Sequence, residues 1–480
     1  MHPSALAKRV PILVAALVAA IIIVFYVYGL GKLPLVGPDE PRYAQVAREM
    51  FTSGDLITPM LGGHTWFEKP ALLYWLIVAA FKIFGVSEWS ARLGPALCGL
   101  LTIAAVWCVG REVEKEYSHF GFWSVIVTAS CLGLIVFSRA ASFDVVITMT
   151  TTWSLAFFLL HELPTTRRKR LLLAGFYALV GLSLLAKGLV GIVIPFGVIG
   201  VYYLLRRTWP GRSVWLSLLW GVPLALAVSA IWYGPVIAKH GWTFIDEFFI
   251  QHHFARYVSN KYHHPQPIYF YPVIILMLVL PWSVHLISAL AKARKWEWRG
   301  SDSLSIVCVF SLAWLLLPIV FFSFSGSKLP GYVLPSLPGA ALLVSYRLTF
   351  VRAAKWPLLI AGATIVAMVV TLNFFAAPFA RHESVRDLLL LADARGYANA
   401  PVLAQRTDDR SAEFYAHGRV VYGPNGEPVT FDEISVDQAR ARGGKLVVFI
   451  PVEYVEKIRG APAIEIIGDN GKTAVLGWRP

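Results

Sequence analysis

The chain has 480 residues, of which 57% are hydrophobic and 15% are charged. This composition excludes an ordinary soluble domain, which has a lower apolar share and a higher charged share. Lys and Arg outnumber Asp and Glu by 43 to 29, for a net charge of +14. The basic residues stand between long apolar runs, so the charge does not predict a nucleic-acid partner. The chain is therefore predicted to be a polytopic membrane protein.

The first apolar run, Pro11–Leu30, follows Lys8 and Arg9 and is long enough to cross the hydrocarbon core. A signal peptide is the alternative, but the run is longer than an h-region and lacks a small-residue cleavage site. Further apolar runs bring the candidate spans to twelve: 71–86, 93–110, 119–137, 143–160, 171–186, 188–205, 214–233, 268–288, 303–322, 331–348 and 356–376. The four cysteines lie in these runs at spacings that fit neither a disulfide framework nor a metal site.

Basic loops predict the orientation, because Lys and Arg accumulate on the cytoplasmic side of a membrane. The clearest basic loops are residues 167–170, 206–212, 292–299 and 347–355. Two candidate spans separate each loop from the next, so all four can be cytoplasmic. A cytoplasmic N-terminus then requires one early candidate not to cross, and the short run at 71–86, which contains Lys82, is the best exception. We therefore predict eleven spans, an interfacial or re-entrant helix at 71–86, and a C-terminus outside.

Residues 37–70 are too polar to cross a membrane. Within residues 41–51, apolar side chains recur at helical spacing while charged side chains take the other side. This pattern predicts a short helix that lies on the outer surface of the membrane.

From about Ala377 the composition becomes that of a soluble domain. Helical patterns at 383–396 and 432–442 alternate with short apolar patterns typical of strands. The predicted strands are 400–405, 419–423, 445–450, 463–467 and 473–478. The predicted fold is an all-α polytopic membrane domain over 1–376 and a small α/β domain over 377–480, outside the membrane. A structural or acceptor-facing role is expected for the second domain.

Four motifs follow one another along the membrane part: Asp-Glu-Pro-Arg-Tyr-Ala at 39–44, Glu-Lys-Pro at 68–70, Leu-Ala-Lys-Gly at 185–188, and Lys-Leu-Pro-Gly-Tyr-Val-Leu-Pro at 328–335. On these motifs the chain resembles the polyprenyl-phosphate-dependent glycosyltransferases. Within them it resembles the bacterial branch of the protein O-mannosyltransferase superfamily, particularly the transferases that move 4-amino-4-deoxy-L-arabinose onto lipid A. The resemblance implies a GT-C fold of about 11–13 transmembrane helices with periplasmic juxtamembrane helices. It also implies a sugar donor on undecaprenyl phosphate, periplasmic transfer and inversion at the anomeric carbon.

The resemblance places Asp39 beside the transferred sugar, with Glu40 as a second carboxylate. Asp39 would be the general base for a hydroxyl acceptor; for a phosphate acceptor it would orient the acceptor or stabilise the oxocarbenium-like sugar. Capping of the following helix is the alternative for these acidic residues. The predicted sugar- and acceptor-binding residues are Arg42, Tyr43, Glu68 and Asp144.

A departing lipid phosphate gains charge as the glycosidic bond breaks, so fixed cations are expected around it. The predicted phosphate-binding residues are Lys69, Lys187, Arg256, Lys328 and Tyr332. Two of them have alternatives: Lys187 could extend to the lipid headgroups, and Tyr332 could belong to the aromatic belt of a membrane protein. The resemblance gives Arg256 the position of a phosphate-facing arginine.

Four histidines occur within residues 252–264, but they lack the HExxH zinc spacing and a completing carboxylate pattern. A divalent metal stays open, with Glu68 and His253 as weak candidate ligands, and no other cofactor is expected.

The leading functional prediction is a bacterial inner-membrane glycosyltransferase that moves a sugar, such as 4-amino-4-deoxy-L-arabinose, from undecaprenyl phosphate to lipid A or a related envelope acceptor. Transfer to protein Ser or Thr, or to another polysaccharide, is the enzymatic alternative. A transporter or flippase for a lipid-linked sugar is the non-enzymatic one, although its expected internal repeats are not visible.

Overall fold

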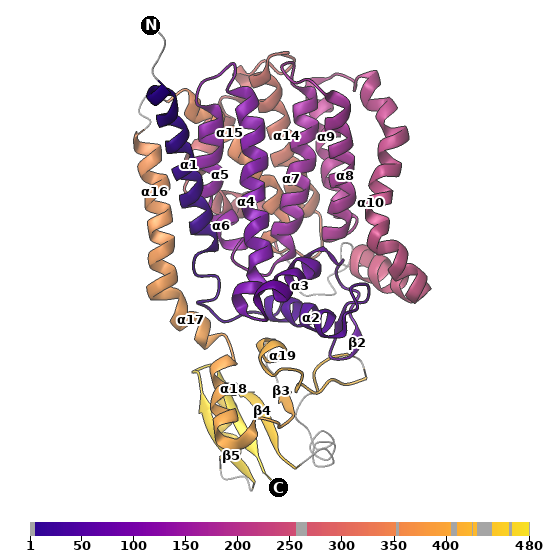
Figure 1. The fold of residues 1–480 in the computed structure, drawn as a ribbon, viewed down its shortest axis with the longest axis vertical. Helices are drawn as coiled ribbons and strands as arrows, with labels where there is room; N and C mark the ends of the chain where they lie inside the picture. Colours follow the sequence, from indigo (N-terminus) through magenta and orange to yellow (C-terminus); the bar gives the residue numbers. More distant parts are fainter. Residues whose placement is uncertain are drawn as a thin grey trace.

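A helical bundle makes up most of the protein, and a small domain with a sheet lies at one end of it (Figure 1). The computed structural model describes residues 5–255, 266–351, 355–404, 410–424, 426–429, 444–459 and 463–479. The bundle helices are α1 (Ala5–Val27), α4 (Glu88–Val113), α5 (Phe120–Ser130), α6 (Leu132–Phe137), α7 (Phe143–Glu162), α8 (Lys169–Lys187), α9 (Val190–Arg206), α10 (Arg212–Ile245), α12 (Phe270–Leu278), α13 (Ser283–Ala291), α14 (Ser303–Ser323), α15 (Leu337–Thr349) and α16 (Lys355–Val370).

Several bundle helices are long and apolar enough to cross a membrane. Among the described residues six helices meet that condition, or up to seven if the bent pair α12–α13 is one span. Shorter apolar helices, α5 and α9 among them, stand beside these in the bundle. The chain is therefore a multi-pass membrane protein, and the count of eleven crossings stays a prediction.

Two of the bundle helices are broken at the same place. The backbone is extended at Cys131, between α5 and α6, and α12 meets the segment from Ser283 at 118°. The amide of Leu132 donates to the carbonyl of Leu280 at 2.8 Å, and the Trp282 indole donates to the Ser130 hydroxyl at 3.0 Å. These hydrogen bonds between the two broken helices satisfy polar groups that lose their partners within a helix at each break. In an apolar surrounding such groups need another partner.

Helix α7 is the inner helix of the bundle and packs on α4, α8 and α9. Its buried threonines donate back to carbonyls one turn earlier, for example Thr151 to Ile147 at 2.7 Å and Thr148 to Asp144 at 2.6 Å. Hydroxyls satisfied in this way let polar side chains lie inside an apolar bundle. The four cysteines are free, and three of them are buried, in agreement with the sequence.

Helices α2 (Glu40–Ser53) and α3 (Leu72–Phe84) lie below the bundle, on the side of the C-terminal domain (Figure 1). Between them runs a short antiparallel hairpin of β1 (Met60–Leu61) and β2 (His64–Thr65). Helix α3 has 13 residues and does not run through the bundle, which agrees with the expectation for the run at 71–86. The expectation for α2 was incomplete: helix α19 of the C-terminal domain packs on it, so α2 does not lie on an open surface.

The C-terminal domain contains a four-stranded sheet of order β3-β4-β6-β5, with β3 and β4 parallel and the other pairs antiparallel. Its elements are α17 (Ala376–His382), α18 (Arg386–Ala392), β3 (Val402–Ala404), α19 (Ser411–Tyr415), β4 (Leu446–Pro451), α21 (Val455–Ile458), β5 (Ile464–Asp469) and β6 (Thr473–Trp478). The predicted strand at 419–423 forms only isolated bridges at Val420 and Tyr422, and the predicted helix at 432–442 lies outside the described residues.

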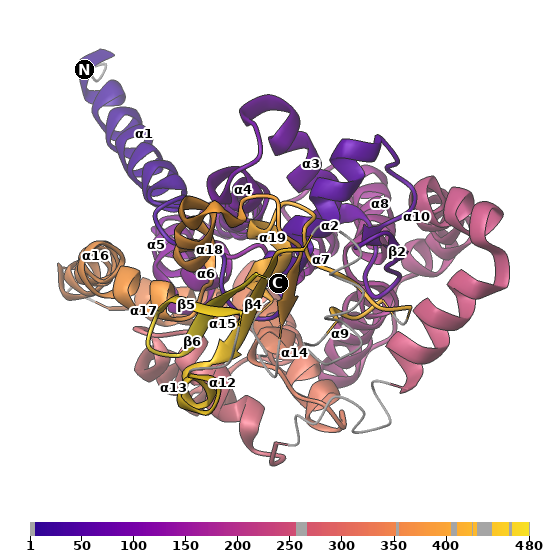
Figure 2. The same cartoon turned by 90° about the horizontal axis from the view of Figure 1, so that it is seen from below.

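The C-terminal domain shares an apolar core cluster with the bundle and also makes polar contacts to it near α19. The Tyr415 hydroxyl lies 2.7 Å from the Leu35 amide, which donates to it, and 3.1 Å from the Glu88 carboxylate. Arg386 donates to the same carboxylate at 3.2 Å. Helix α16, which links the two parts of the chain, stands at the edge of the bundle with exposed apolar side chains (Figure 2).

Candidate functional site

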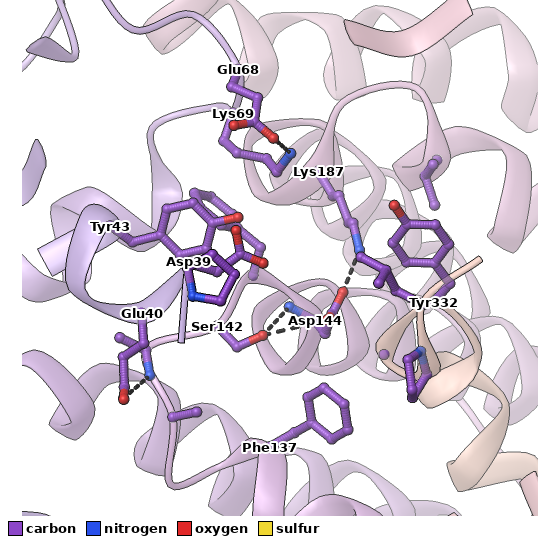
Figure 3. Close-up of a pocket in the computed structure, with 18 of the residues that line it drawn as sticks. Asp39, Glu40, Tyr43, Glu68, Lys69, Phe137, Ser142, Asp144, Lys187 and Tyr332 are labelled. Atoms are coloured by element: carbon purple, nitrogen blue, oxygen red, sulfur yellow. Dashed lines mark hydrogen bonds and ion pairs between the residues drawn. The ribbon is translucent and has the colours of Figure 1, made fainter. Parts of the chain in front are cut away.

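A cavity of about 400 Å³ opens where the ends of several bundle helices meet α2, on the side of the C-terminal domain. We call it the central cavity. Its polar lining residues are Asp39, Glu40, Tyr43, Glu68, Lys69, Ser142, Asp144, Lys187, Ser325 and Tyr332. They come from the start of α2, the loop before α3, the start of α7, the end of α8, the turn after α14 and the 3-10 segment η3 (Pro330–Ser336) (Figure 3). Residues far apart in the sequence thus face one space.

Asp39 lies at the N-terminus of α2 and its side chain makes no capping hydrogen bond to the helix. Its carboxylate accepts a hydrogen bond from Arg42 at 2.8 Å, and half of the side chain is exposed. Capping was the alternative considered for this residue, and the geometry does not support it. Asp39 is a carboxylate at the cavity wall that is accessible from outside.

Glu40 requires a correction, because sequence reasoning grouped it with Asp39 as catalytic. Its two oxygens accept from Arg92 of α4, each at 2.7 Å, and also from the amides of Ala141 and Val36. Arg92 in turn donates to three carbonyls of the loop after α1, those of Leu30, Leu33 and Pro34. A buried carboxylate saturated by donors holds the loop in place and has no lone pair left for a substrate.

Glu68 and Lys69 lie side by side on the loop before α3. The Lys69 ammonium donates to Glu68 at 2.6 Å, and Arg42 lies 3.9 Å from the other Glu68 oxygen. Burial alone would lower the pKa of Arg42, but the charges of Glu68 and Asp39, together with Tyr43, raise it overall. Arg42 therefore stays charged, stacked over the Trp66 ring at 5.1 Å, and joins the two carboxylates.

Tyr43 points its ring into a cluster of aromatic side chains beneath the cavity. The ring lies edge-on to Phe143 at 4.9 Å and to Tyr74 at 6.4 Å. Burial, with the nearby charges of Asp39 and Glu68, raises the pKa of Tyr43 well above its ordinary value. Tyr43 therefore stays neutral. Its hydroxyl can donate a hydrogen bond but does not ionise to act as a base.

Asp144 and Lys187 form an ion pair across the cavity, between the start of α7 and the end of α8 (Figure 3). The Ser142 hydroxyl caps α7 by accepting from the Asp144 amide at 3.1 Å. The Lys187 ammonium lies 4.6 Å from the centre of the Tyr332 ring, so Tyr332 of η3 faces it. A Cβ atom on Gly331 would meet the Asp144 carboxylate at 1.9 Å, so glycine is required for η3 to approach this closely.

Two other predicted phosphate ligands, Lys328 and Arg256, are not among the residues that line the central cavity in the described part of the chain. Lys328 is absent from the described lining, and its ammonium donates to the carbonyl of Gln266 at 2.9 Å. Arg256 lies outside the described residues, and so does the side chain of His253. Within the described part of the chain, no group of three or more His, Cys, Asp or Glu side chains could hold a metal ion. The other weak metal candidate, Glu68, contacts two cations instead.

Sequence reasoning missed Arg92, which is the partner that fixes Glu40. The signal was present, because a charged residue at the beginning of an apolar run is a functional or structural candidate. The pairing of Lys187 with Asp144 was missed as well, since these residues are 43 positions apart. Chemically, the cavity offers accessible carboxylates beside ammonium groups, and an incoming anion can compete with those carboxylates for the lysines.

Comparisons with known proteins agree on one fold. Residues 12–286 match the family model described as dolichyl-phosphate-mannose-protein mannosyltransferase. An undecaprenyl phosphate-alpha-4-amino-4-deoxy-L-arabinose arabinosyl transferase of Pseudomonas aeruginosa is 33% identical over 68% of this chain and 57% of its own. A transferase of the same description from Pseudomonas fluorescens is 30% identical over 69% and 59%. The chain thus spans less than two thirds of the length of these curated relatives.

Solved structures give the same result at lower sequence identity. ArnT from Cupriavidus metallidurans bound to undecaprenyl phosphate has a TM-score of 0.79 at 22% identity, over 96% of this chain and 97% of that one. An oligosaccharyltransferase of Archaeoglobus fulgidus has a TM-score of 0.53 at 14% identity, over 91% and 69%. At such identities the likeness shows the fold alone, and it confirms the GT-C fold that the sequence motifs implied.

Proposed function

Because the chain belongs to the dolichyl-phosphate-mannose-protein mannosyltransferase family, we propose that it is a membrane glycosyltransferase that moves a sugar from undecaprenyl phosphate to an envelope acceptor. Lipid A is the leading acceptor and 4-amino-4-deoxy-L-arabinose the leading sugar, since curated relatives carry that description. The observation that carries the proposal is the central cavity, where Asp39 and the Lys187–Asp144 pair face one space.

The lysines of the cavity bind the phosphate of the donor. As the bond between the anomeric carbon and the phosphate oxygen breaks, its electron pair stays on that oxygen. Lys187 then exchanges part of its contact with Asp144 for the phosphate, and Lys69 does the same with Glu68. Fixed cations at the developing charge lower the barrier to breaking this bond. Tyr332, whose ring lies beside Lys187, is the proposed hydrogen-bond donor to the same phosphate.

Asp39 acts on the acceptor side. A hydroxyl acceptor loses its proton to Asp39 as its oxygen forms the new bond to the anomeric carbon. An acceptor that is itself a phosphate needs no general base, and Asp39 then stabilises positive charge on the sugar ring. The exposed half of the Asp39 side chain supports either role, because an acceptor can reach it.

The protein lies in the bacterial inner membrane with the cytoplasmic N-terminus that the basic loops predict. The lining of the central cavity includes the start of α2, and α2 lies on the side of the bundle where the C-terminal domain stands (Figure 1), so the cavity and this domain then face the periplasm. A donor on undecaprenyl phosphate fits this placement, since its lipid lies in the membrane while its sugar reaches the cavity.

The substitution Asp39→Asn tests the proposal. With purified protein, a sugar on undecaprenyl phosphate and lipid A, transfer is expected to fall about 10²- to 10⁴-fold, while the melting temperature stays within a few degrees. Asp387→Asn, an exposed aspartate of α18, is the matched control. Full turnover by Asp39→Asn would remove the catalytic role of this residue.

Mass spectrometry of lipid A from cells with and without the gene tests the acceptor. A mass increment that depends on the gene is expected, and unchanged lipid A would remove this acceptor in favour of protein or polysaccharide. Transport of the donor by reconstituted protein without release of lipid phosphate would contradict the enzyme and support a flippase.

A further inference from the structure

A second polar cavity, of about 510 Å³, lies between α2 and the C-terminal domain. We call it the interdomain cavity. Helix α2 contributes one wall, the turn of the β1–β2 hairpin another, and residues 413–422 the third. Its lining includes the polar side chains of Gln45, Arg48, Glu49, Glu413, His417 and Tyr422. The volume is within the range of small-molecule sites.

Two buried acceptor atoms of this cavity, Oε1 of Gln45 and Oε2 of Glu413, accept no well-formed hydrogen bond from the described residues, although the Tyr422 hydroxyl interacts with the Glu413 carboxylate. These residues are only 4% and 2% exposed. The Gln45 amide is oriented by its nitrogen, which donates to Glu49 at 3.0 Å, so the oxygen is the atom left over. Burial raises the pKa of Glu413 although Arg410 and Arg42 oppose the shift, which agrees with a carboxylate short of donors.

The remaining groups define what kind of molecule would fit. Arg48 donates to the Phe414 carbonyl at 2.7 Å, and burial lowers its pKa to about 10, so it still carries its charge at neutral pH. The negative charges of Glu49 and Glu413 offset the positive charge of Arg48, so the cavity does not favour binding of an anion. The two unpartnered acceptors require a ligand that donates, and hydroxyl or amino groups of a sugar do so. Arg48 has further donors for the sugar oxygens, whereas the Tyr422 hydroxyl already interacts with Glu413.

The two cavities are joined through α2. The N-terminal turn of this helix lines the central cavity, and the turns that follow line the interdomain cavity. Arg42 lies between them, because it pairs with Asp39 and also acts on the charge of Glu413. A molecule held in the interdomain cavity is therefore beside the helix that presents Asp39.

We propose that the interdomain cavity is a subsite that binds a neutral or amino sugar of the acceptor glycan through Gln45 and Glu413. This inference rests on the proposed function, because it assigns the site to the acceptor of that reaction. The C-terminal domain then has a binding role, since it supplies half of the subsite.

Binding and transfer measured separately test the subsite in the full-length protein. The probe for binding is a β-1,6-linked glucosamine disaccharide without phosphates or acyl chains, observed by saturation-transfer NMR. Gln45→Met and Glu413→Gln remove the unpartnered acceptors with little change of shape, and Glu413→Gln keeps an oxygen for the hydrogen bond from Arg410, so the fold is expected to stay intact. Each is expected to weaken disaccharide binding and to raise the KM for lipid A about tenfold, at unchanged donor KM. Glu456→Met, at an exposed glutamate of α21, is the matched control.

The outcomes separate the two proposals. Wild-type protein that transfers sugar but binds no disaccharide, or variants with unchanged acceptor KM, would overturn the subsite and leave the function standing. Disaccharide binding that both variants abolish, in a protein without transfer to lipid A, would uphold sugar binding in the interdomain cavity and overturn lipid A as the acceptor. Should one variant fail to fold, as judged by its melting temperature, the other gives the same comparison.

Discussion

Two ion pairs at the same end of the bundle illustrate how burial separates a structural role from a reactive one. Glu40 and Arg92 are 8% and 5% exposed, and the described residues satisfy both carboxylate oxygens and both terminal nitrogens of the guanidinium. Asp144 and Lys187 are 18% and 15% exposed and face the central cavity. The first pair has no capacity left for a ligand, whereas the second can exchange partners.

The lysine of the second pair has spare hydrogen-bonding capacity. An ammonium group has three N–H donors, and the described residues give Lys187 one hydrogen-bonding acceptor, Asp144, besides the Tyr332 ring. Chain position did not distinguish the pairs, since all four residues lie at or near helix ends. The predictions below test whether saturation by donors distinguishes them.

The largest effect is expected on removing Arg92. Arg92→Met leaves the Glu40 carboxylate buried without its charged partner, which should lower the free energy of unfolding by about 3–5 kcal/mol. Denaturant or thermal unfolding in detergent measures it. The double variant Arg92→Met/Glu40→Met should recover most of the loss, and a single variant as stable as wild type would refute a structural role for the pair.

Lys187→Met should lower activity and leave stability nearly unchanged, in contrast to Arg92→Met. Loss of a fixed cation at the departing phosphate lowers kcat/KM about 100-fold, while the melting temperature changes by a few degrees because the pair is partly exposed. Transfer kinetics and a melting curve on one preparation give both values. Lys115→Met, at an exposed lysine that also pairs with a carboxylate, is the control. A Lys187 variant that loses stability and keeps its turnover would reverse the assignment.

Gly331→Ala sharpens the comparison without touching a charge. The added methyl group would lie 1.9 Å from the Asp144 carboxylate and pushes it away, and a displacement of about 1 Å should reduce turnover about 10- to 100-fold. Gly362→Ala, where a Cβ meets nothing within 4 Å, is the matched control. Equal activities for the two variants would mean that the approach of η3 to Asp144 is unimportant.

The smallest effect concerns a more exposed pair, Asp55 with Lys239 of α10. Partial burial would raise the pKa of Asp55, but hydrogen bonds from Lys239 and from the Ile57 and Thr58 amides lower it overall. The folded-state pKa is thus below the unfolded value, so the stabilisation is complete above about pH 4 and is lost as the pH falls further. Asp55→Asn should cost up to about 1 kcal/mol at pH 7 and less at pH 3. A cost that is the same at both pH values would contradict this.

Much of the architecture could be predicted from periodicity, because spanning helices and short strands leave clear patterns. The motif residues Asp39 and Lys187 follow apolar runs and Lys69 precedes one, and the ends of those runs meet on one side of the bundle. Tertiary contacts could not be predicted in the same way. The partner of Glu40 lies 52 residues away, and the cover that α19 gives α2 depends on how the C-terminal domain docks. Lys328 shows the limit of a motif, since its backbone is near the cavity while its ammonium contacts Gln266.

The loose position of α16 has a consequence for how the protein can be assembled. This helix shows much of its apolar surface, including Trp356, Leu359 and Val366, and stands apart from the bundle centre (Figure 2). The C-terminal domain is instead fastened by α19 to Glu88 and Leu35, which belong to the first hundred residues. We therefore expect docking without covalent continuity between α15 and α16. Two separately translated pieces, cut between these helices, should find each other in the bilayer and restore the complete molecule.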